Sequence, residues 1–189
     1  EEARSRAALV RVVVITTALS VPACLVPCIV GDLFLVRWVG PGYPDSYRYM
    51  LAMLVPATLD GAFAPVWMAL HARGRIGWIA TGDIVVAVGN VAISLLLAQV
   101  LHLGLLGFAL GNTIAIVVRN LFLWPLMGRR DSSMPSMRAT LGPLPWALLG
   151  TAPGLLLLWL ARPLYGGSLA AVIIAGLAGG AICLAGSLL

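Results

Sequence analysis

Lysine is absent from this chain of 189 residues, and charged residues of all kinds make up only 10% of it. Every basic residue other than histidine is therefore an arginine, and twelve of them against seven acidic residues give a formal net charge of +5. Apolar residues account for 61% of the sequence, more than a soluble domain of this length can bury. The shortage of charge, with a mean hydropathy of +1.01, predicts a membrane protein.

The sequence also lacks the motifs that mark common enzyme classes. It has no HExxH, GxSxG or GxxxxGK[ST] pattern. His71 and His102 are expected on opposite faces of the membrane, where they cannot share a site. Cys24, Cys28 and Cys183 lie in apolar stretches without metal-ligand spacing, and we interpret them as small packing residues. We therefore expect no enzymatic activity, no metal and no cofactor.

Long apolar runs take up most of the chain, and about 20 apolar residues suffice for a helix to span a bilayer. The sequence predicts an all-α polytopic bundle of about six transmembrane helices, as a single unit over residues 1–189. The expected spans are 7–30, 47–70, 76–101, 105–127, 143–160 and 168–189. The first is expected to run on as helix to Trp38 and to bend at Pro22 and Pro27.

Arginine is distributed unequally between the two ends of these spans. Three arginines fall on one side: Arg37, Arg48 and Arg162. Eight fall on the other: Arg4, Arg6, Arg11, Arg73, Arg75, Arg129, Arg130 and Arg138. The positive-inside rule then places the N-terminus in the cytoplasm and the protein in the cytoplasmic membrane. Because topology accounts for the basic pI of about 9.7, nucleic acid is not an expected partner.

Two further residue classes indicate how the helices sit in lipid. Glycines recur four apart, a spacing that lets helix backbones approach closely, at Gly107 and Gly111, Gly150 and Gly154, and Gly176 and Gly180. Tryptophans lie near the predicted span ends, where we interpret them as interfacial anchors: Trp38, Trp67, Trp78, Trp124, Trp146 and Trp159.

Three charges fall deep inside the predicted spans, away from the span ends, where ionised groups are costly enough to suggest a role. From the helical rise, Asp60, Asp83 and Arg119 lie roughly 16, 10 and 13 Å from the cytoplasmic ends of their helices. They come from three consecutive helices at similar depths. Polar residues accompany them at helical spacing, so the candidate substrate-binding or coupling residues are Asp60, Asp83, Asn90, Asn112, Arg119 and Asn120.

Two interpretations of these charges remain open. In the first, Asp83 and Arg119 form an internal ion pair that only fixes helix packing. In the second, the polar residues line a cavity for substrate or protons. One arginine between two carboxylates leaves one of them unpaired, and we expect this to be Asp60, between two prolines. We expect Asp60 to be protonated during part of a transport cycle.

Residues 37–127 resemble the C-terminal half of the polysaccharide-type flippases, within the multidrug/oligosaccharidyl-lipid/polysaccharide exporter superfamily. Four landmarks match in order: LVRWVGPGY at 35–43, ALHARGR at 69–75, VGNVAISLLL at 88–97 and HLGLLGFAL at 102–110. They resemble the family's Gly-aromatic loop, its "ALGR"-like turn, its "xxNxxLNxxL" run and its "yGxxGaA" turn. The turn Gly104-x-x-Gly107 is the most specific of these. Ser94 departs from the pattern, since the family often has asparagine there.

The resemblance implies that this chain is the second bundle, the C-terminal lobe, of a two-lobe exporter. The whole protein would flip a lipid-linked oligosaccharide or polysaccharide precursor by alternating access. Its partners would be membrane lipid, the lipid-linked glycan and a missing N-terminal lobe, and the opening residues of the chain do resemble a loop from within a longer protein. Arg119 would bind the phosphate of the cargo, with Arg11 as a second candidate.

Two alternatives stay open at this point. A drug or cation antiporter of the same superfamily would rely on Asp60 and Asp83 to bind cations, although Arg119 would repel such a cargo. A non-transporting scaffold of a glycan-assembly complex would tolerate the joint neutralisation of Asp83 and Arg119.

Overall fold

The computed structural model describes residues 2–42, 45–74, 76–123, 126, 134–165 and 168–188. Across these residues the regular structure is helical, without a strand. The main helices are α1 (Glu2–Trp38), α2 (Ser46–Ala72), α3 (Ile76–Leu95), α4 (Leu105–Val118), α7 (Pro143–Leu160) and α9 (Leu169–Leu188). The short helices are α6 (Met137–Leu141) and α8 (Arg162–Tyr165). Two π-helical turns, η1 (Leu96–Val100) and η2 (Arg119–Leu123), extend α3 and α4.

Within the part of the chain that the structure describes, five helical segments are long and apolar enough to cross a membrane: Glu2–Trp38, Ser46–Ala72, Ile76–Val100, Leu105–Leu123 and Met137–Leu160. A further apolar helix, Leu169–Cys183 within α9, is shorter and corresponds to the sixth predicted span. In lipid a chain satisfies its backbone hydrogen bonds within helices, which accounts for this uniform architecture. The chain is a multi-pass membrane protein with an all-α fold, as its composition predicts.

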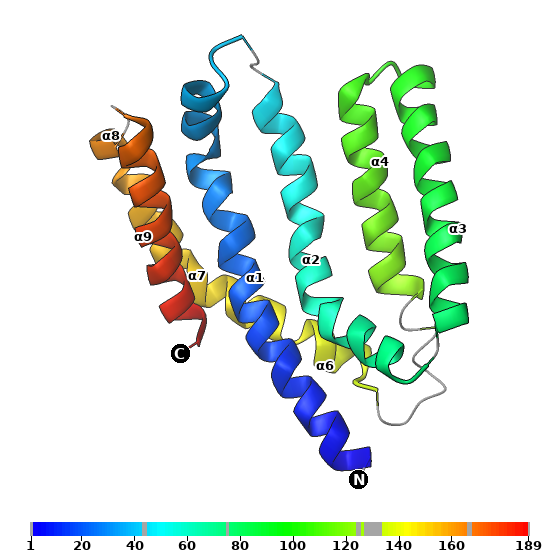
Figure 1. Cartoon of the computed structure of the whole chain (residues 1–189). Coiled ribbons are helices and arrows are strands. Elements are labelled where there is room, and N and C mark those ends of the chain that lie inside the picture. Colours follow the sequence, from blue (N-terminus) through cyan, green and yellow to red (C-terminus); the bar gives the residue numbers. More distant parts are fainter. Residues whose placement is uncertain are drawn as a thin grey trace.

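The helix boundaries differ from the predicted spans at several places. Helix α1 begins at Glu2 and is 37 residues long. At 1.5 Å per residue this is about 55 Å, well beyond the ~30 Å hydrocarbon core, and its charged end projects from the bundle (Figure 1). Helix α6 lies in a segment predicted as loop, where the Ser136 hydroxyl accepts a hydrogen bond from the Ala139 amide at 3.2 Å. Arg75, Arg129, Arg130 and part of the fourth predicted span lie outside the described residues.

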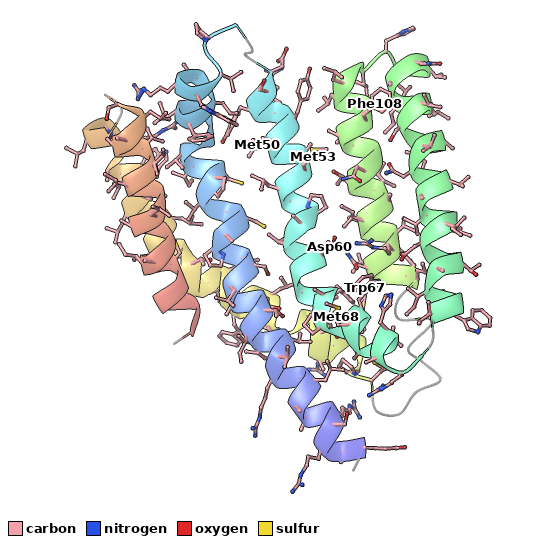
Figure 2. The ribbon with its side chains drawn as sticks, viewed as in Figure 1. Met50, Met53, Asp60, Trp67, Met68 and Phe108 are labelled. Atoms are coloured by element: carbon pink, nitrogen blue, oxygen red, sulfur yellow. The ribbon has the colours of Figure 1, made fainter. Side chains whose placement is uncertain are left out.

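Helix α2 is continuous through Pro56 and Pro65. It changes direction between Asp60 and Met68 (Figure 2). Pro65 has no amide hydrogen for the carbonyl of Gly61, and a missing bond of this kind lets a helix bend. Gly61 also permits a close approach of α2 to α1, because a Cβ at this position would lie 2.4 Å from the Cβ of Ser20 on α1. The bend lies next to Asp60.

The helices pack in two groups on either side of α2. Helix α1 contacts α2, α7 and α9, whereas α4 packs between α2 and α3 (Figure 1). One buried cluster joins α1 to α2 around Val13, Phe63 and Leu70. A second joins α1, α7 and α9 around Val30 and Leu158. Because α2 is the shared element, a residue on its α4 side lies in the seam between the two groups.

The repeated glycines do not all serve the expected role. Gly107 and Gly111 do bring α4 against α3 and η1, since Cβ atoms there would lie 2.5 and 2.1 Å from atoms of Ala98 and Ser94. Gly154 brings α7 against Cys183 on α9 in the same way. Gly176 and Gly180 do not, because a Cβ would meet ordinary contacts at the first and nothing within 4 Å at the second. Close packing is therefore confirmed at Gly107, Gly111 and Gly154, and the prediction is wrong for Gly176 and Gly180.

Candidate functional site

The most polar contact between α2 and η2 is a three-residue cluster around Asp60. The Arg119 guanidinium donates from Nη2 to Oδ1 of Asp60 at 2.5 Å, and the Asn120 amide donates to the same oxygen at 2.8 Å. Asn120 is 1% exposed, whereas the side chains of Asp60 and Arg119 are 40% and 27% exposed. The Asp60 carboxylate thus accepts hydrogen bonds from the Arg119 guanidinium and the Asn120 amide among apolar helices.

Two adjacent residues of η2, Arg119 and Asn120, reach the same carboxylate. In a regular α-helix neighbouring side chains point about 100° apart. The π-helical turn begins at Arg119, whose amide donates to the carbonyls of Ala115 and Ile116. π-Helical turns occur frequently at functional sites.

A pocket of about 310 Å³ adjoins this cluster, lined by Asp60, Phe63, Ala64, Trp67, Arg119 and Asn120. Two donors on its wall are buried without a hydrogen-bond partner, Nε of Arg119 and Nε1 of Trp67. An unsatisfied buried donor is costly, and because both atoms are buried, an acceptor in the pocket pairs with them only when the two side chains move. The pocket is therefore suited to an oxygen-rich, anionic group.

One of the two open interpretations of the charges, and one expectation, are wrong. Arg119 pairs with Asp60, and no Asp83–Arg119 pair is formed. Asp60 is consequently not the unpaired carboxylate; of these two carboxylates, it is Asp83 that has an oxygen, Oδ1, buried without a hydrogen-bond partner. Because α4 packs on both α2 and α3, a residue at this depth of η2 can face either carboxylate, and the sequence does not reveal which.

The remaining predicted site residues form a separate seam. Asn90 on α3 donates to the side-chain oxygen of Asn112 on α4 at 3.4 Å, and Ser94 donates to Asn90 at 3.1 Å. Ser94 is buried against Gly111. These contacts hold α3 to α4, and neither asparagine lines the pocket at Asp60. The six candidates thus divide into a pocket cluster, an interhelical seam and Asp83.

Sequence analysis missed two polar features. Trp67 was interpreted as a lipid anchor, yet it lines the pocket and contacts the His71 ring, with centroids 4.0 Å apart and the two rings tilted by 58°. Its spacing from Asp60, seven residues along one helix, was the available signal. Arg162 forms an ion pair with Asp32, which the predicted end of the first span at residue 30 had placed outside the membrane.

Among the described residues, no three histidine, cysteine or acidic side chains gather as metal ligands. No protein-family model matches the chain, and the comparisons with curated proteins and with solved structures find no match.

Proposed function

We propose that this chain is one lobe of a transporter that flips a lipid-linked oligosaccharide or polysaccharide precursor across the cytoplasmic membrane. The observation that carries the proposal is the Arg119 guanidinium, set among membrane-spanning helices with its Nε free beside a pocket. An arginine at this depth is costly unless it is paired or used. The class of cargo, a lipid-linked glycan, is proposed from the resemblance of residues 37–127 to the polysaccharide-type flippases.

Arg119 has a binding mode that suits a phosphate. Guanidinium groups bind phosphate through two parallel N–H donors, and Nε is one member of such a pair. Asn120 also bonds to Asp60, so the carboxylate keeps one donor while Arg119 turns towards the cargo. In this mechanism the phosphate competes with Asp60 for Arg119, and its release restores the ion pair.

The pocket is lined by residues of α2 and η2, so it forms one wall of a site. Alternating access needs a second wall that closes over the cargo. We assign that wall to an N-terminal lobe, with the N-terminus of this segment in the cytoplasm.

Replacing Arg119 tests this role directly. In vesicles containing the full protein, Arg119→Gln is expected to slow translocation of a fluorescent lipid-linked oligosaccharide by roughly 10- to 100-fold, the value of a charged hydrogen bond. Arg119→Lys should recover only part of the rate because lysine cannot bind bidentately. Arg48→Gln is the matched control, since Arg48 pairs with Asp45 at 3.4 Å on the surface. Unchanged translocation by Arg119→Gln contradicts the proposal.

The unpaired oxygen of Asp83 supports the antiporter alternative, because a buried free acceptor can bind a cation or a proton. The flippase and the antiporter predict opposite orders for the effects of substituting Asp83 and Arg119 on transport. For a flippase we expect Asp83→Asn to retain most of the translocation that Arg119→Gln loses. For an antiporter, uptake of a fluorescent cationic drug into vesicles would depend on Asp83 and would tolerate Arg119→Gln. A scaffold would tolerate both substitutions together.

A further inference from the structure

Another pocket lies where the N-terminal half of α1 meets α6 and the start of α7. Its volume is about 400 Å³, within the roughly 300–1,000 Å³ range of ligand sites. Among the described residues that line it, one is charged, Arg138 of α6. Val10, Val14 and Ala18 line it from one stripe of α1, and Trp146 lines it from the first turn of α7. We call it the α1–α6 pocket.

Helix α6 has a buried face that fixes the position of Arg138. Met137 and Leu141 pack against the cluster that joins α1 to α2, and Thr140 is 2% exposed. At about 100° per residue, Arg138 and Ala139 turn to the other side of this short helix, where both line the pocket. The backbone of Arg138 is therefore held beside the pocket while its side chain stays exposed.

The charge around the pocket is mainly positive. Arg138 has no acidic partner within the described part of the chain. The N-terminal half of α1 adds three exposed arginines, Arg4, Arg6 and Arg11, against one acidic residue, Glu2. This half of α1 projects from the bundle (Figure 1). Basic side chains close to a membrane surface attract anionic lipid, so this end of the bundle favours an anionic ligand.

The pocket lies at the boundary between acyl chains and headgroups. Trp38, at the other end of α1, is 67% exposed, as an interfacial tryptophan is expected to be. Counting about 30 Å of hydrocarbon core back from Trp38 reaches Ala18, and a tilted helix moves this boundary towards Val14. Val10 lies about 12 Å beyond Ala18, past a headgroup region about 5–8 Å deep. Trp146 is 75% exposed at this level, as a second interfacial tryptophan.

We infer that the α1–α6 pocket binds one phospholipid with an anionic headgroup, its phosphate on Arg138 and the upper part of its acyl chains against Val14 and Ala18. A guanidinium without a counter-ion offers two parallel donors to a phosphate. The apolar lining and the depth favour a lipid over a soluble anion. The surrounding arginines repel the cation of a choline headgroup, whereas a glycerol headgroup carries none. The inference does not depend on the proposed transport function.

The test measures which lipid the purified full protein retains. The protein is exchanged into micelles that contain equal amounts of phosphatidylglycerol and phosphatidylcholine, and bound lipid is counted by native mass spectrometry. We expect one phosphatidylglycerol per chain, retained roughly tenfold over phosphatidylcholine, the factor that one charge-assisted hydrogen bond provides. Equal retention of the two lipids overturns the assignment. Displacement of the lipid by soluble glycerol phosphate also overturns it, because the apolar lining would then contribute nothing.

A pair of arginine variants separates the pocket from the general positive charge of this end. Arg138→Gln is expected to abolish the preference for phosphatidylglycerol. Arg4→Gln is the matched control, because it removes the same charge from the same end of the bundle and Arg4 does not line the pocket. It should keep the preference. Equal losses in the two variants would show that diffuse charge attracts the lipid, which contradicts the proposal.

A pair of valine variants tests the place of the acyl chains. Val14→Trp fills the pocket and is expected to remove the bound phosphatidylglycerol. Val12→Trp is its matched control, because Val12 is 46% exposed and Val14 45%, and Val12 is not part of the lining. It should retain the lipid. Equal retention by the two variants contradicts the proposal, and the wild-type comparison decides it if a variant fails to fold.

Discussion

Substitution of Gly107 by alanine is expected to destabilise the protein by about 2–3 kcal/mol, the cost of overpacking a rigid contact. The added Cβ would lie 2.5 Å from the backbone nitrogen and 2.7 Å from the Cα of Ala98. These are backbone atoms, so no side-chain rotation relieves the clash, and α4 must move away from η1. Reversible denaturation in mixed micelles, followed by circular dichroism, measures the change in unfolding free energy.

Gly89→Ala is the matched control and is expected to act in the opposite direction. A Cβ on Gly89 meets nothing within 4 Å in the middle of α3, so only the helix propensity changes. Alanine is favoured over glycine in a helix by about 1 kcal/mol, and we expect a stabilisation of that order. Equal effects of the two substitutions would mean that the close approach of α4 and η1 is not a stabilising contact.

Breaking the ion pair between Asp60 and Arg119 should have an effect of similar size. Asp60→Asn leaves the Arg119 charge without a counter-ion among apolar helices, a loss of about 3 kcal/mol. Arg119→Gln leaves the carboxylate with the Asn120 amide as its remaining partner at 2.8 Å, and we expect a smaller loss. The same denaturation measurement applies to both variants.

The double variant distinguishes a specific pair from two independent polar residues. Without either charge this contact leaves no uncompensated ion behind, so Asp60→Asn with Arg119→Gln is expected to be no less stable than Asp60→Asn alone. A coupling free energy of about 1–3 kcal/mol between the two sites would follow. Additive losses would instead show that Asp60 and Arg119 do not interact in the membrane.

The part of the site that sequence could predict was its depth and composition. Asp60, Arg119 and Asn120 were selected because polar residues within apolar spans are costly, and the structure brings these three together. The π-helical turn that begins at Arg119 had no sequence signal, although both residues that donate to Asp60 lie in it. Trp67 was misjudged for a related reason, since position along a helix does not reveal whether an indole faces lipid or a pocket.

Composition and hydropathy alone determined that this is an all-α, multi-pass membrane protein, because a bilayer admits few ways of satisfying a backbone without water. They also located most helix ends, where glycine, proline and arginine interrupt the apolar runs. Only tertiary structure decided that Arg119 pairs with Asp60 rather than Asp83, and that Gly176 and Gly180 line a groove instead of a helix contact. These contacts depend on which helices become neighbours and on how each helix is rotated about its axis. Hydrophobicity does not indicate that rotation, because it is nearly uniform around a helix in lipid.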